Sequence, residues 1–304
     1  MQVVTAAGAG AVSVVIPAYK AASTIRRAVQ SVLQQTQPPL EILVVDDGSP
    51  DREEAAELAG LDGPRTALVQ LRKANGGRNF GLDRAAGEWI AFLDADDYWE
   101  PAKLERQLMA AQAHPESALI GSLWWEEAPG RPRRLCALSF GPYGRPLRHP
   151  ADNAFLTALS LWTGTVMVRR SALANVRFDA GLATAEDRDV WCRLASQNTV
   201  YVVGEPLATY VQLATSLSNS DVDRDCASML KVVERHGAVL GASGVREQTA
   251  VVHRRWAAGH LSRGQFQRAL SPALRRLRLQ PLSVEAWWVV TKSAVKSVLH
   301  SGAV

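Results

Sequence analysis

The feature that most constrains the fold is the alternation of short apolar runs with helix-like segments along the first hundred residues. Four runs rich in Val, Ile and Leu occupy residues 12–16, 41–45, 67–71 and 89–93. They lack the polar alternation of half-exposed strands, which is typical of strands buried on both faces. Helical patterns lie between them at residues 23–35, 51–58 and 80–86. The pattern predicts a parallel sheet covered on both sides, that is, an α/β doubly wound domain.

Polar clusters follow three of these runs directly. They are Pro17-Ala18-Tyr19, Asp46-Asp47-Gly48-Ser49 and Asp94-Ala95-Asp96-Asp97. The carboxyl ends of parallel strands lie at one edge of a sheet, where ligands bind in open α/β folds. We therefore expect the three clusters to form one site.

Each acidic cluster allows two interpretations. The carboxylates of residues 94–97 would repel one another unless a divalent cation bridged them to phosphate oxygens. They could equally form a solvated turn or a helix N-cap. The turn at residues 46–49 could accept hydrogen bonds from a nucleobase or a ribose hydroxyl, or it could be an ordinary Asp-Gly turn.

Two further segments carry chemistry. Residues 75–79 combine Asn75, two glycines and Arg78, a set that could approach and neutralise a diphosphate or could be a plain Asn-Gly turn. Three carboxylates begin a predicted helix at residues 185–195, where Asp and Glu are also favoured by the helix dipole. One of them could serve as a general base toward an attacking hydroxyl.

Taken in order, six motifs resemble the inverting glycosyltransferases of family 2, which have the GT-A fold. They are VVIPAY (14–19), VVDDGS (44–49), GGRN (76–79), FLDADD (92–97), VMVRRS (166–171) and AEDRDVW (185–191). The likeness covers residues 11–218. It implies a Rossmann-like, mostly parallel sheet. It also implies transfer of a sugar from a UDP- or dTDP-sugar to an acceptor hydroxyl, in the synthesis of a polysaccharide, glycolipid or envelope glycan.

The resemblance also implies roles for the matching residues. The nucleoside of the donor would contact four of them, Pro17, Tyr19, Asp46 and Asp47. Arg78 would lie near the diphosphate or order the acidic loops, and Asp94 would face the ribose and sugar. Asp96 would bind the cofactor, a divalent Mn²⁺ or Mg²⁺, together with the diphosphate. Asp187 is the predicted base, with Glu186 as the fallback.

Two departures from the family pattern bear on this reading. The loop at residues 75–79 is shorter than usual, and Val211 and Leu213 stand where the family often has Arg and His. The missing His predicts weaker metal binding and leaves an alternative open, a catalytically inactive sugar-nucleotide-binding module. A phosphatase of the Asp-x-Asp type is disfavoured, because the required downstream Thr or Ser and Lys pattern is absent.

The remaining chain divides by composition. Residues 126–152 contain five prolines and five arginines and predict a long irregular connection that contributes to acceptor binding. Strand patterns follow at residues 163–169, 201–203 and 207–211. From residue 221 onward only helices are expected, with breaks at residues 237–244, Pro272 and Pro281. We expect a catalytic GT-A domain over residues 1–220 and a helical appendage over 221–304.

Charge and cysteine content limit the partners and the compartment. The chain of 304 residues has a net charge of only +4, too mild for a dedicated nucleic-acid binder. Its three cysteines show no metal-ligand spacing and favour a reduced, cytoplasmic compartment. The expected acceptor is a glycan, a lipid-linked molecule or a small molecule.

Positive charge gathers at the end of the chain. Residues 246–304 hold ten Lys and Arg against two acidic residues, with three tryptophans among them. Such a face could lie on an anionic membrane, bind an anionic polymer, or be solvated with its tryptophans packed inward. The first interpretation places the protein peripherally on the inner face of the membrane.

Overall fold

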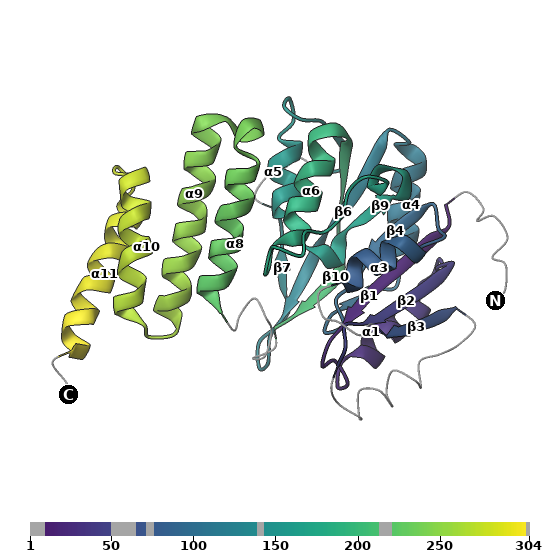
Figure 1. Ribbon diagram of the computed structural model, residues 1–304, viewed down its shortest axis with the longest axis horizontal. Coiled ribbons are helices and arrows are strands. Elements are labelled where there is room, and N and C mark those ends of the chain that lie inside the picture. The colour runs from purple at the N-terminus through teal and green to yellow at the C-terminus, as the bar shows by residue number, and fades with distance from the viewer. Residues whose placement is uncertain (1–9, 50–64, 71–75, 139–142, 213–220, 302–304) are drawn as a thin grey trace. The chain divides into compact units, whose positions relative to one another are not determined.

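The computed structural model describes residues 10–49, 65–70, 76–138, 143–212 and 221–301. The chain divides into two compact units. One contains residues 1–180 and 186–213, and the other contains residues 181–185 and 214–304. The first unit is an α/β structure and the second is built from helices (Figure 1).

The α/β unit is organised by a mixed, mostly parallel sheet. Its strands are β1 (Val12–Ala18), β2 (Glu41–Asp46), β3 (Thr66–Gln70), β4 (Trp89–Phe92), β5 (Tyr98–Trp99), β6 (Ser117–Glu127), β7 (Arg134–Cys136), β8 (Pro146–Leu147), β9 (Met167–Arg169) and β10 (Thr199–Val211). The order is β3-β2-β1-β4-β9-β6-β10-β5, with β7 beside β6 and β8 beside β10. Strands β3, β2, β1 and β4 are parallel, β6 and β10 are parallel, and β9 is antiparallel to both its neighbours. This confirms the predicted α/β fold class.

Helices cover both faces of the sheet. Helices α1 (Ile25–Leu33) and α4 (Lys103–Ala113) pack in the core on one face. Helices α3 (Gly77–Arg84), α5 (Ala154–Ser160) and α6 (Glu186–Gln197) pack in the core on the other. Val14 and Ile16 belong to the first core and Val15 to the second, because successive strand residues point to opposite faces. Both faces are therefore apolar, which explains the absence of polar alternation.

Several predicted elements differ from the structure. Residues 126–152 are not wholly irregular, because β6 runs to Glu127 and β7 and β8 pair with longer strands. The patterns at 201–203 and 207–211 are one strand, β10, whose pairing shifts register around Pro206. Residues 163–165 form a 3₁₀ turn before β9. The helix predicted at residues 51–58 lies outside the described residues.

The second unit contains α8 (Val222–Arg235), α9 (Gly237–Ser262), α10 (Phe266–Leu279) and α11 (Val284–Ser301), each packed on the next (Figure 1). Gly241, with a φ of 65°, interrupts α9 at the predicted break. The break predicted at Pro272 was wrong, because α10 continues through it. Proline removes one backbone hydrogen bond, and burial of the Pro272 ring offsets that loss. No described helix combines the length and apolarity that a membrane crossing requires.

Candidate active site

The first two polar clusters meet at the carboxyl edge of the sheet. Strands β1 and β2 run in parallel register to the pair Ala18 and Asp46. Beyond it, the Asp47 amide donates to the Ala18 carbonyl at 2.8 Å, and the Lys20 amide donates to Ser49 Oγ at 3.0 Å. The structure therefore joins the loops that carry the nucleoside-binding candidates.

Asp46 and Tyr19 differ in what they can offer a ligand. Asp46 is buried, and its Oδ1 accepts from the amide and the hydroxyl of Ser49 at 3.0 and 2.7 Å. This closes the Asp-Gly turn, with Gly48 at a φ of 83°. Tyr19 is 49% exposed and presents a ring to solvent beside this turn. Asp46 thus fixes the loop, and Tyr19 has surface available for stacking.

Asp47 explains why the glycine pair is present. Its Oδ1 accepts from the Gly76 amide at 3.2 Å, at the N-terminus of α3. A Cβ on Gly77 would lie 3.0 Å from Asp47 Oδ2 and 3.2 Å from Pro17 Cβ. Burial raises the pKa of Asp47, while the amides of Gly76 and Gly77 oppose the rise. The glycine therefore lets three segments approach closely.

Arg78 links two of the acidic clusters. Its NH2 donates to Asp94 Oδ1 at 2.6 Å, and its NH1 donates to Glu186 Oε1. The three side chains are 21–27% exposed. Burial alone would lower the pKa of Arg78, but the negative charges of Asp94 and Glu186 outweigh burial and raise the pKa overall. The guanidinium is therefore permanently charged. The sheet edge and the start of α6 are thus tied together through one cation.

Glu186 and Asp187 occupy different environments at the start of α6. Burial raises the pKa of Glu186, Arg78 opposes the rise, and Asp187 reinforces it. Asp187 Oδ2 accepts from the Thr163 hydroxyl at 2.5 Å, and Oδ1 accepts from the Arg188 amide at 2.7 Å. These bonds fix the Asp187 rotamer, and no ion pair joins Asp187 to a cation among the described residues. Since a carboxylate has about four acceptor sites, Asp187 can still accept a further proton donor.

The turn after β4 concentrates negative charge. Asp97 is buried, and its Oδ1 accepts from the Val211 amide at 2.7 Å. Burial raises the pKa of Asp97 well above its usual range, and the charges of Asp96 and Asp94 raise it further. Asp96 itself is half-buried, and its carbonyl accepts from Arg27 at 2.6 Å. Three carboxyl groups, one of them buried, thus lie at the carboxyl end of β4.

The donor set fits a divalent cation only in part. Within the described ranges, no three His, Cys, Asp or Glu side chains are grouped so as to hold a metal ion. Mg²⁺ is commonly held by one or two carboxylates, waters and substrate phosphates, and Asp96 could supply such an oxygen. Val211, where the family often has Arg, contributes its backbone amide to Asp97. Leu213, where the family often has His, lies outside the described residues. The site therefore fits a cation whose ligands come partly from the protein and partly from a bound diphosphate.

Three residues in this region were not singled out for function from the sequence. Thr163 bonds Asp187 across 24 positions. Phe178 lies under Arg78, with 5.8 Å between the guanidinium carbon and the ring centroid. The Asn79 side chain bonds the Phe178 carbonyl and amide at 2.8 and 2.9 Å. No local pattern marks Thr163 or Phe178, whereas Asn79 was visible as the residue after the arginine.

Comparisons with known proteins agree with this arrangement. Residues 13–177 match the model of "Glycosyl transferase family 2". The teichuronic acid biosynthesis glycosyltransferase TuaG of Bacillus subtilis is 31% identical over 228 residues, covering 69% of this chain and 82% of TuaG. The amylovoran biosynthesis glycosyltransferase AmsB of Erwinia amylovora is 28% identical over 221 residues, covering 65% of this chain and 68% of AmsB.

A solved structure supports the fold. Crystalline S. aureus TarS, residues 1–349 in complex with UDP-GlcNAc, matches with a TM-score of 0.63 at 18% identity, covering 96% of this chain and 92% of TarS. The likeness identifies the α/β unit as a GT-A fold. The family match extends over more than half of the chain and includes the motifs at the sheet edge. This chain is therefore a glycosyltransferase of family 2.

Proposed function

We propose that the protein transfers a sugar from a UDP- or dTDP-sugar to an acceptor hydroxyl, with inversion, in the synthesis of a polysaccharide, glycolipid or envelope glycan. Family membership, the names of TuaG and AmsB, and the UDP-GlcNAc complex of TarS support this assignment. The observation that carries it is the bridge from Arg78 to Asp94 and Glu186, with Asp187 beside it.

On the donor side, the nucleoside would contact Tyr19 and Pro17, and the loop fixed by Asp46 and Asp47. Asp94 would face the ribose and sugar. Arg78 holds Asp94 in place through a charge-assisted hydrogen bond, which limits the rotamers available to that carboxylate.

On the acceptor side, Asp187 would accept the proton of the attacking hydroxyl. The acceptor oxygen forms a bond to the anomeric carbon as the bond to the phosphate oxygen breaks, and the nucleoside diphosphate leaves. Thr163 positions the base, and Arg78 is bonded to Glu186 rather than to Asp187. This difference favours Asp187 over Glu186 as the base, because the Glu186 carboxylate is held in an ion pair with Arg78 and is therefore less available to an acceptor hydroxyl.

Asp96 would hold the divalent cation together with the donor's diphosphate. A cation bound there stabilises the negative charge that develops on the leaving group. Isothermal titration with UDP, with and without Mn²⁺, tests this role. We expect Mn²⁺ to increase the affinity and Asp96→Ala to abolish that increase; an unchanged metal dependence in the variant would show that Asp96 is not the ligand.

Donor hydrolysis and transfer, screened across several sugar nucleotides, test the reaction itself. We expect Asp187→Asn to lower kcat by about 10²–10⁴-fold while UDP affinity is retained. Glu234→Gln, an exposed carboxylate on α8, is the matched control. Full turnover by Asp187→Asn would refute the base assignment. UDP binding without turnover of any donor would favour the alternative, a catalytically inactive sugar-nucleotide-binding module.

We further propose that α11 associates with an anionic membrane surface, on the inner face in a cytoplasmic setting. Trp287 and Trp288 are 55% and 59% exposed, and the Lys292 ammonium lies 4.6 Å from the Trp288 ring centroid. Exposed tryptophans beside lysines are typical of interfacial helices. Co-sedimentation with phosphatidylglycerol vesicles should weaken about tenfold in Trp287→Ala/Trp288→Ala but not in Leu274→Ala. Equal binding by the three proteins would refute the proposal.

A further inference from the structure

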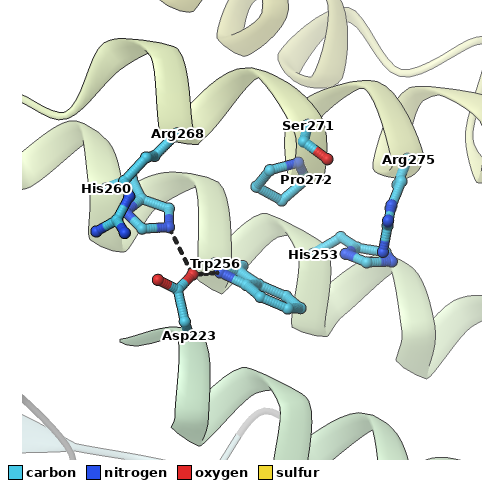
Figure 2. Close-up of a pocket in the computed structure, with 8 residues that line it drawn as sticks. All are labelled: Asp223, His253, Trp256, His260, Arg268, Ser271, Pro272 and Arg275. Carbon is cyan, nitrogen blue, oxygen red and sulfur yellow. Dashed lines mark hydrogen bonds and ion pairs between the residues drawn. The ribbon is translucent and has the colours of Figure 1, made fainter. Parts of the chain in front are cut away.

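The helical unit contains a cavity of about 190 Å³ between α9 and α10, close to the start of α8. Figure 2 shows its lining side chains converging from the three helices. His253, Trp256 and His260 recur at helical spacing on α9, and Arg268 and Arg275 lie two turns apart on α10. The cavity is thus lined by one face of each long helix.

The acidic residue of the cavity is already bonded. Asp223 Oδ1 accepts from the Trp256 indole at 2.5 Å and contacts His260 Nε2 at 2.9 Å. His260 Nδ1 contacts Gln265 Oε1 at 2.7 Å, so both ring nitrogens of His260 are used. Desolvation opposes ionisation of Asp223, but these two hydrogen bonds lower its pKa overall. This triad is a structural clamp and holds the indole against the cavity.

The two arginines that line the cavity, Arg268 and Arg275, are not hydrogen-bonded to described residues as Asp223 is. Across the described part of the chain, neither Arg268 nor Arg275 makes an ion pair or hydrogen bond, although other arginines of this unit do, such as Arg255 with Asp225. Both are exposed. In Figure 2 they lie at opposite ends of the cavity, Arg268 beside His260 and Arg275 beside His253. The charge of Arg268 also acts on Asp223 and contributes to its lowered pKa.

A third polar group has no partner either. His253 is only 4% exposed, and its Nδ1 is buried without a hydrogen bond to any described residue. In Figure 2 the His253 ring lies next to Arg275. Burial, reinforced by Arg275, lowers the pKa of His253, so the ring is neutral and Nδ1–H in one tautomer is a donor. A buried polar atom without a partner is costly unless a ligand or water satisfies it.

We propose that this cavity binds a phosphate ester, with its phosphate oxygens at Arg275 and His253 and with Arg268 at the opposite end of the cavity. The Arg275 guanidinium beside the His253 imidazole matches an anion with up to two charges and several acceptor oxygens better than a single carboxylate, and Arg268 adds positive charge at the other end of the cavity. The Trp256 and Pro272 rings line the same cavity and offer apolar surface to the organic part of the ester. This site is additional to the proposed transfer reaction.

Binding of defined probes to the full chain tests the proposal. The probes are inorganic phosphate, glycerol 3-phosphate, acetate, and vesicles of phosphatidylglycerol or phosphatidylcholine. Arg268→Gln, Arg275→Gln and the double variant remove the guanidiniums. Arg278→Gln, an exposed arginine of the same helix outside the cavity, is the matched control. Because all three arginines are exposed, the variants should fold, and circular dichroism checks that they do.

We expect phosphate or its ester to bind at least tenfold more weakly to Arg275→Gln, with a smaller loss in Arg268→Gln, and undetectably to the double variant. Arg278→Gln should bind like the parent chain. Variant-sensitive binding of soluble phosphates identifies a free ester as the source, and variant-sensitive binding of phosphatidylglycerol vesicles alone identifies a lipid headgroup; either supports the site. Three results would overturn the proposal. They are equal affinity of the double variant and the parent chain for every phosphate probe, equal affinity of the parent chain for acetate and phosphate, and no binding of any phosphate probe.

Discussion

Replacing Arg78 by Gln should destabilise the α/β unit in a pH-dependent way. The guanidinium bonds Asp94 and Glu186, and all three side chains are about a quarter exposed. Breaking a fully buried ion pair costs about 3–5 kcal/mol, and an exposed pair contributes about 0–1 kcal/mol. Two carboxylates lose their partner here at intermediate burial, so we expect a loss of about 2–3 kcal/mol at pH 7.5. For a unit of this size, that corresponds to a fall in Tm of roughly 4–12 °C.

The pH dependence follows from Glu186. Its pKa in the folded chain already lies above the usual value because of burial, and Arg78 opposes that rise. A carboxyl group with a raised folded pKa stabilises the fold when protonated, and loses that stabilisation as the pH rises. Without Arg78 the pKa of Glu186 rises further. The loss in free energy of unfolding caused by Arg78→Gln should therefore be about 1 kcal/mol smaller at pH 5 than at pH 7.5.

Urea unfolding at pH 7.5 and pH 5 measures both effects. Arg84→Gln is the matched control, since Arg84 is an exposed arginine of the same helix and contacts the Phe80 ring. We expect Arg84→Gln to change the free energy of unfolding by about 0.5 kcal/mol or less at either pH. An Arg78→Gln loss no larger than that of the control, or equal losses at the two pH values, would refute the electrostatic argument.

Three further substitutions test the packing that supports the site. Gly81→Ala should lower the free energy of unfolding by about 1–3 kcal/mol, because the added Cβ would lie 2.4 Å from Val15 Cγ1. Thermal unfolding of the double variant Gly81→Ala/Val15→Ala should show a loss smaller than the sum of the two single losses. Asn79→Ala should cost about 1–3 kcal/mol in urea unfolding, since the Phe178 amide and carbonyl lose their partner; an unchanged midpoint would contradict this. Burial lowers the pKa of Lys103 well below its usual range, so the unfolded chain binds more protons than the folded chain at alkaline pH. The free energy of unfolding of the parent chain should therefore rise by up to about 1.4 kcal/mol per pH unit toward pH 9, and Lys103→Met should abolish that slope.

The sequence predicted the part of the fold that depends on local composition. Strands β1, β2 and β4 are short runs buried on both faces, and the position of the four runs between helices identified a parallel sheet. Helix α4 was not predicted, because its buried face includes Lys103 and Gln107, which resemble surface residues in a sequence. Lys103 donates to Gln107 at 2.7 Å, and Gln107 donates to two backbone carbonyls, so tertiary contacts satisfy both.

The same distinction applies to the site. Asp46 and Asp94 were placed at one edge because parallel strands end together, an inference that needs no three-dimensional structure. The bond between Arg78 and Glu186 joins residues 108 positions apart, and no local pattern specifies it. Thr163 lies in a 3₁₀ turn that the strand pattern had obscured. Positions that act through long-range hydrogen bonds are visible only once the chain is folded.

The arginines of the two units differ in a way that bears on how each binds phosphate. Both terminal nitrogens of Arg78 are bonded to carboxylates, so a diphosphate at the sheet edge would have to displace Asp94 or Glu186 to reach that guanidinium directly. A divalent cation at Asp96, as proposed above, would supply positive charge to the diphosphate without that exchange. Arg268 and Arg275 are bonded to no described carboxylate, so an anion can bind there without exchange. UDP binding should consequently depend on Mn²⁺, whereas phosphate binding in the helical unit should be unchanged by a metal chelator.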